Sequence, residues 1–136
     1  MSGETDLATM LASLDVVARP DPYTLVQLRA DGPLPALGDG VAGVVAEDEG
    51  VTVFATIARA EAENWPVGFV AAWLTLSIHS ALEAVGLTAA VSAALAEVDI
   101  SCNVVAAHHH DHLLVPWDRA DDARAALATL AASDQA

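Results

Sequence analysis

The first half of the chain mixes helical and strand-like hydrophobic patterns. Leu7, Met10, Leu11 and Leu14 recur every three or four residues, and this spacing predicts a short amphipathic helix. Two prolines in the segment 19–22 then interrupt the chain, because each fixes its own backbone and restricts the residue before it. Beyond them the pattern predicts a strand, a helix, a second strand and a charged helix, in this order: Tyr23–Arg29, Leu37–Val45, Val51–Thr56 and Arg59–Asn64.

The second half of the chain has clearer periods. Apolar and polar side chains alternate over Ala72–His79, which predicts a strand with Leu74, Leu76 and Ile78 on one face. The pattern further predicts a helix over Gly86–Val98, strands over Ile100–Ala107 and Leu113–Val115, and a last helix capped by Asp118. The histidine-rich stretch between the two strands is then the end of a hairpin.

The order of elements repeats. Tyr23–Glu47 aligns without a gap with Trp73–Glu97, and Val51–Val53 aligns with Leu113–Val115. Each complete copy is strand–helix–strand–strand–helix, and one more strand makes the βαββαβ arrangement of a ferredoxin-like sandwich. The sequence therefore predicts an α+β protein of two ferredoxin-like units, 1–66 and 67–136, with antiparallel sheets and helices on one face. The first unit would be a shortened copy.

Composition narrows the functional classes. The chain is 54% hydrophobic, and its 19 acidic residues against 5 arginines and no lysine give a formal charge of −14. Such a surface repels phosphate backbones and anionic lipid, so we expect no nucleic-acid or membrane partner. The longest apolar stretch, Val67–Ile78, is too short to span a bilayer. The lone Cys102 excludes an internal disulfide and, without a signal peptide, favours a reducing, cytoplasmic setting.

The sequence lacks the motifs of the common enzyme classes. It contains no Walker loop, no GxGxxG and no HExxH motif. His79 and Ser80 are neighbours that would face opposite ways in a strand, and Cys102 shares its phase with apolar residues. These residues give no nucleophile with a base in reach. We therefore predict a protein that is not an enzyme and needs no cofactor.

A cluster of histidines surrounds Asp111. Histidine and carboxylate are good ligands for zinc and other transition metals. In an extended strand, however, only His110 and His112 share a face, while His109 points away. Two ligands do not close a metal site, so we predict no metal and favour a polar hairpin that contributes to a ligand pocket or a dimer contact. A metal-binding protein or metal-dependent enzyme that uses this hairpin is kept as an alternative.

The stretch LTLSIHSALEAVGLTAAVSAALAEVDISCNVVAA, at 74–107, resembles the ACT domain. With HDHLLVP at 110–116 it is also similar to an uncharacterised bacterial family of tandem ACT-like proteins. This resemblance implies the βαββαβ fold, a regulatory role, a homodimer, and a separate protein as the regulated partner. It also implies an amino-acid ligand at an interface between units, beside the loop from the first strand to the first helix, here His79–Thr88. The proline-rich loop 32–35 departs from the ACT pattern in the first half.

Physical chemistry favours the same loop as a ligand site. Backbone N–H groups and the positive dipole end of a helix N-terminus, here Gly86 to Thr88, can hold an α-carboxylate. Glu83 or Asp111 can accept hydrogen bonds from an α-ammonium group, and Asn103 can donate or accept. The predicted ligand residues are His79, Ser80, Glu83, Val85, Gly86, Leu87, Thr88, Asn103, His110, Asp111 and His112. The second hypothesis is a structural or protein-interaction module without a ligand.

Overall fold

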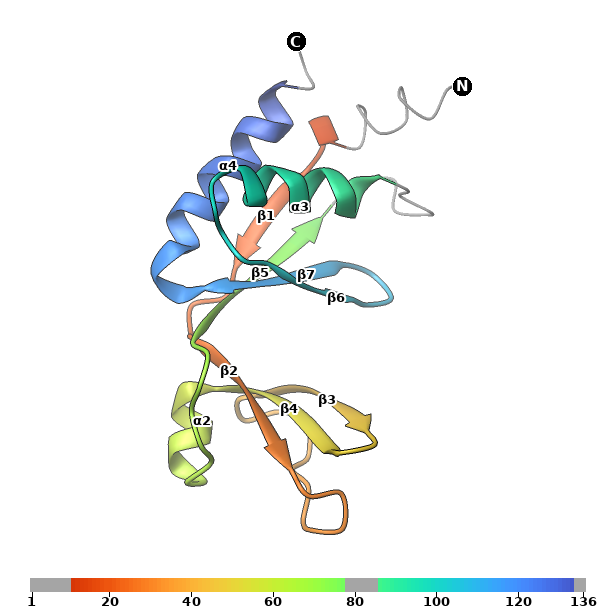
Figure 1. Ribbon diagram of the computed structural model, residues 1–136, viewed down its shortest axis with the longest axis vertical. Coiled ribbons are helices and arrows are strands. Elements are labelled where there is room, and N and C mark those ends of the chain that lie inside the picture. Colours follow the sequence, from red (N-terminus) through yellow and green to blue (C-terminus); the bar gives the residue numbers. More distant parts are fainter. Residues whose placement is uncertain (1–10, 78–85, 134–136) are drawn as a thin grey trace. The chain divides into compact units, whose positions relative to one another are not determined.

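The computed structural model describes residues 11–77 and 86–133, and the protein divides into two units (Figure 1). The middle unit is residues 20–71. The split unit combines residues 11–19 with the described residues of 72–136. Both units are α+β with antiparallel strand pairs, as predicted. Residues 11–19 thus group with the second half of the chain, a feature that the predicted division at 66–67 does not contain.

The middle unit holds three strands and one helix. They are β2 (Tyr23–Leu28), β3 (Val41–Glu47), β4 (Gly50–Thr56) and α2 (Ile57–Ala62). β4 pairs antiparallel with both β2 and β3. The Thr56 side chain accepts a hydrogen bond from the Arg59 N–H at 3.1 Å and so caps α2. The core of the unit is mainly valine and alanine: Val26, Val41, Val51, Val53, Ala55 and Ala60. The predicted strands at 23–29 and 51–56 and the helix near 59–64 are confirmed.

The predicted helix over Leu37–Val45 is wrong, because β3 occupies 41–47. Gly38, Asp39 and Gly40 all have positive φ angles (101°, 50° and 90°), which a right-handed helix cannot continue through. The valines that follow are β-branched and gain partners in β4. The gapless alignment of Tyr23–Glu47 with Trp73–Glu97 therefore fails after its first strand, since it sets β3 against a helix. The middle unit has no helix between its first two strands.

Over the described residues, the named elements of the split unit are four strands and two α-helices. They are β1 (Asp15–Ala18), β5 (Ala71–Ser77), α3 (Leu87–Glu97), β6 (Asn103–Ala106), β7 (Asp111–Pro116) and α4 (Ala120–Ser133). The strand order is β1-β5-β7-β6, with β1 antiparallel to β5 and β6 antiparallel to β7. The strands and helices predicted for the second half are confirmed over these residues. A 3₁₀ turn, Trp117–Arg119, precedes α4, so Asp118 lies inside that turn and does not cap the last helix.

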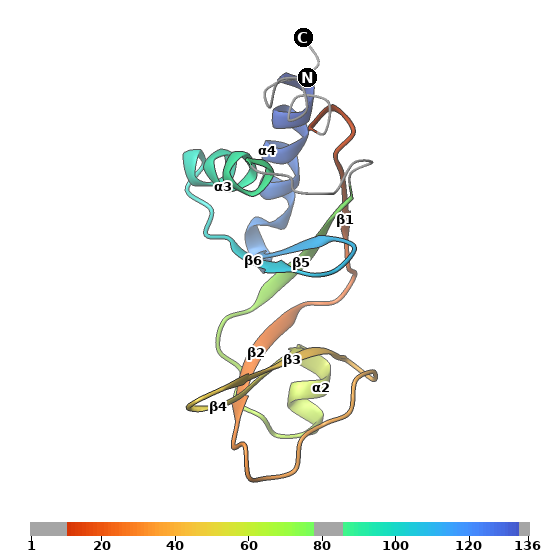
Figure 2. The same ribbon diagram turned by 90° about the vertical axis from the view of Figure 1, so that its right-hand side faces the viewer.

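One face of the split unit's strands carries the core. Figures 1 and 2 show α3 and α4 on the same side of β5, β6 and β7. Leu74 and Leu76 of β5 point to this side, which confirms the predicted alternation for these two residues, while Ile78 lies outside the described residues. The other buried members of the core are Leu11, Ala72, Leu87, Val91, Leu95, Ile100, Leu113, Val115, Ala123 and Leu127. Cys102 is half-buried against this core, and burial raises the pKa of its thiol. Among the described residues, no helix has the length and apolarity that crossing a membrane requires.

Candidate functional site

The beginning of α3 is the described part of the loop predicted to bind a ligand. His79, Ser80, Glu83 and Val85 lie outside the described residues. Gly86 is the N-cap of α3 and has a φ of 97°, in the left-handed region that favours glycine. Its carbonyl accepts the first helical hydrogen bond, from the Ala90 N–H at 2.8 Å. Because glycine has no side chain, Gly86 leaves the first N–H groups of α3 without a side-chain cap of its own.

The next two residues of α3 have different surroundings. The Leu87 side chain is only 2% exposed and belongs to the core of the split unit, so it anchors the first turn of the helix. Thr88 is exposed. What this helix end offers a ligand is therefore backbone N–H groups and the Thr88 hydroxyl, while the predicted contribution of Leu87 reduces to its backbone.

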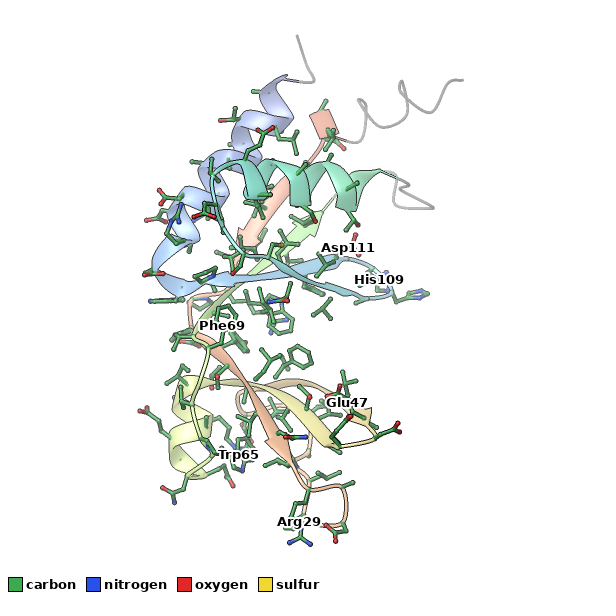
Figure 3. All side chains as sticks on the ribbon, in the orientation of Figure 1. Arg29, Glu47, Trp65, Phe69, His109 and Asp111 are labelled. Carbon is green, nitrogen blue, oxygen red and sulfur yellow. The ribbon has the colours of Figure 1, made fainter. Side chains whose placement is uncertain are left out.

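The strand register assigns the hairpin residues to two sheet faces. Asp111 lies in β7 two residues before the buried Leu113, so it shares the helix-covered face. Figure 3 shows Asp111 on the side of α3 and His109 at the end of the hairpin. His112 lies on the opposite face. Asn103 also points there, because it pairs with Leu114, the second residue after His112. The predicted ligand residues thus do not all converge on one surface.

The hairpin itself is a tight turn of exposed histidines. The Ala107 N–H donates to the His110 carbonyl at 3.0 Å, and the rings of His110 and His112 have centroids 6.3 Å apart. Over residues 11–77 and 86–133, no group of three or more histidine, cysteine, aspartate or glutamate side chains is placed to hold a metal ion.

His112 is the centre of a polar cluster on the face opposite the helices. The Trp73 Nε1–H donates to His112 Nδ1 at 3.1 Å, and Thr75 Oγ1 lies 2.9 Å from the same nitrogen. An indole N–H can only donate, so Nδ1 is the acceptor and the neutral ring carries its proton on Nε2. The Arg19 guanidinium carbon lies 4.2 Å from the centroid of the Trp73 ring. Burial, then the charges of Arg19 and His110, lower the pKa of His112, against a raising effect of Asp111.

A cavity of about 300 Å³ lies between the end of β1 and the beginning of α4. Its polar lining consists of Arg19, Asp118, Asp121 and Arg124, and Trp117 adds an aromatic side chain that is 42% exposed. Three alanines, from β1, β5 and α4, form the rest of its wall. None of these four charged residues is among the ligand residues predicted from the sequence. The spacing of Asp118, Asp121 and Arg124, three residues apart, was the available signal for a shared helical face.

Comparison with known proteins identifies the family. A family model of the ACT domain matches residues 69–129, and a second ACT-domain model matches residues 2–72. The chain therefore belongs to the ACT-domain family and carries two matches in tandem, as the resemblance implied. ACT domains are generally regulatory modules that bind small molecules such as amino acids, and they are not themselves catalytic.

Two solved structures are similar over most of the chain. A Vibrio cholerae protein of unknown function, described as a possible transport protein, is 32% identical with a TM-score of 0.81, and the match covers 96% of this chain and 99% of that one. An Agobacterium tumefaciens protein is 22% identical with a TM-score of 0.67, covers 87% and 89% of the two chains, and shows the shared fold alone. No curated protein matches the chain significantly.

Proposed function

We propose that this chain is a non-catalytic regulatory protein that binds a free amino acid in its split unit, at the beginning of α3. Membership of the ACT family supports the ligand class. The observation that carries the location is Gly86, a left-handed N-cap without a side chain before an eleven-residue helix. The first turn of α3 also contains no acidic residue. A ligand carboxylate can therefore accept hydrogen bonds from the first N–H groups and be stabilised by the positive end of the helix.

Asp111 supplies the complementary charge in this proposal. It is half-buried and lies on the same sheet face as α3, so it is the predicted carboxylate that suits an α-ammonium group. Asn103 and His112 lie on the other face, and His112 already holds Trp73 and Thr75. We assign His112 to positioning this cluster, and Gly86, Thr88 and Asp111 to the ligand.

Topology also supports a site in the split unit. We infer that β5, α3, β6, β7 and α4 form the βαββα part of a ferredoxin-like unit and that β1 takes the place of its last strand. The middle unit has no helix between β2 and β3 and so offers no equivalent helix end. We further propose a cytoplasmic homodimer that acts on a separate protein, as the family resemblance implies. Ligand binding then shifts the population of two conformations of this assembly.

A thermal-shift panel of the common amino acids tests this function. A ligand that binds only the folded chain stabilises it by about 2.7 kcal/mol at a hundredfold excess over Kd, which corresponds to a shift of several degrees. Thr88→Asp is the sharpest variant, because an acidic side chain near a helix N-terminus stabilises the helix but repels a ligand carboxylate. We expect it to fold and to lose the shift. Ala93→Asp, at an exposed position farther along α3, is the matched control and should keep it.

The same panel separates the alternatives. A folded wild-type chain that no amino acid stabilises at millimolar concentration would favour an interaction module without a ligand. A shift with zinc but with no amino acid would favour a metal-binding hairpin. Retention of the full amino-acid shift by Thr88→Asp would exclude the beginning of α3 as the site.

A further inference from the structure

The cavity beside α4 has a balanced charge in a strongly acidic chain. Two arginines and two aspartates line it, so its lining carries no net formal charge. The whole chain has a formal charge of −14, and its five Lys and Arg residues are all arginines. Two of these five cations therefore line a single cavity. A neutral ligand that carries separated opposite charges would suit this lining best, because it leaves no net charge uncompensated.

The charged groups on the α4 side of the cavity form no ion pair with other described residues. Arg29, Arg59 and Arg119 form ion pairs with Asp31, Glu63 and Asp122 respectively. Arg124, Asp118 and Asp121 form no ion pair within the part of the chain that the structure describes. With 19 acidic residues against 5 arginines, most cations in this chain find a carboxylate. Arg124 can thus donate hydrogen bonds to the carboxylate of a ligand without breaking an existing ion pair.

The spacing of these groups puts both signs on one surface. Asp121 and Arg124 are three residues apart on α4 and therefore lie on neighbouring positions of one helix face. Asp118 lies one turn earlier, in the 3₁₀ turn, beside Trp117. The volume of about 300 Å³ is at the lower end of the range of small-molecule pockets. Three alanines in the wall leave this space open, and the exposed Trp117 ring offers an apolar surface.

We propose that this cavity binds a small zwitterion, a free α-amino acid, with its carboxylate on Arg124 and its ammonium group on Asp118 or Asp121. The ligand's side chain lies against Trp117. This inference rests on the proposed function in its ligand class, but its site is separate from the beginning of α3. The cavity discriminates against inorganic phosphate and against simple amines, because each presents only one sign of charge to a lining that carries both.

Isothermal titration calorimetry on the full chain tests the cavity. The amino acid that stabilises the wild-type chain most in the thermal-shift panel is the probe, together with its methyl ester and its N-acetyl derivative. Arg124→Gln should weaken binding roughly ten- to hundredfold, the usual effect of losing a hydrogen bond to a charged group. Asp121→Asn should weaken it in the same sense, and the two derivatives should bind poorly. Arg29→Gln, the same substitution at an exposed arginine of the middle unit, is the control and should bind normally.

The variants separate this proposal from the proposed function. Arg124 has an exposed side chain without an ion pair, so Arg124→Gln should keep the wild-type melting temperature. An unchanged melting temperature shows that any loss of binding is not caused by unfolding. Loss of binding in Arg124→Gln but not in Thr88→Asp would support the cavity and exclude the α3 location. Loss in Thr88→Asp alone would overturn the cavity and leave the proposed function standing. Two binding steps, each lost in one variant, would support both sites, and no binding by the wild-type chain would overturn both.

Discussion

Leu11→Ala probes the contribution of the N-terminal segment to the split unit. Leu11 is 2% exposed and packs in a core whose other fully buried members all come from residues 72–127. The substitution removes three buried carbon groups at about 0.8 kcal/mol each and adds the cost of the cavity left behind. We therefore expect a loss of about 3 kcal/mol in the free energy of unfolding. Leu37→Ala is the matched control, because Leu37 is 69% exposed and its truncation should cost less than about 0.5 kcal/mol.

Urea unfolding followed by tryptophan fluorescence measures the size of this loss, and native-state hydrogen exchange locates it. Amides of α3 and β7 should lose protection in Leu11→Ala, because they surround the same core. The amides of β4, in the middle unit, should change less. If the loss of protection were confined to residues 20–71, or if Leu11→Ala were as stable as Leu37→Ala, residues 11–19 would not belong to the split unit.

Three positions of the chain, His112, Gly40 and Thr56, have local roles that single substitutions can test. The pKa of His112 is lowered from 6.5, so the stability that its neutral form contributes should be complete above pH 6.5 and be lost as the pH falls through the folded-state pKa. Melting temperatures measured against pH should show this loss, and His112→Gln should remove this pH dependence. Gly40→Ala should cost at least about 2 kcal/mol in a urea titration, because φ is 90° and a Cβ would lie 2.6 Å from Thr56 Oγ1, whereas Gly68→Ala meets nothing within 4 Å and should be near neutral. Thr56→Ala should lower the free energy of unfolding by about 1 kcal/mol through loss of the α2 cap, and an unchanged urea midpoint would contradict that role.

Hydrophobic periodicity predicted the elements of the split unit well, because each element buries the side chains of one face. The two-residue alternation of β5 and the three- to four-residue spacing of Leu87, Val91 and Leu95 in α3 are both consequences of a single core. The same reasoning failed over 37–45. A register shift between Val41 and Gly43 interrupts the alternation of β3, and the remaining valine spacing imitates a helix. The positive φ angles at residues 38–40 exclude the helix, but they are properties of the folded backbone and not of the hydrophobic pattern.

The candidate sites were only partly predictable, because the cavity beside α4 depends on pairing between distant segments. The alternation along β7 already separates Asp111 from His112, so their opposite faces were readable from the buried Leu113 and Val115. The pairing of β1 with β5 was not readable, since nothing local links Asp15–Ala18 to residues 74–77. That pairing brings Arg19 beside Trp73 and into the lining of the α4 cavity. Sequence patterns therefore predicted the helices and the hairpin but not the charged cavity.

We propose above all that this ACT-family chain binds a free amino acid. Calorimetric titration of the wild-type chain with each common amino acid tests that claim most directly. We expect saturable heat with at least one amino acid and a Kd below the millimolar range, with little heat from the corresponding methyl ester. A folded chain that gives no saturable heat with any of them at millimolar concentration would contradict it.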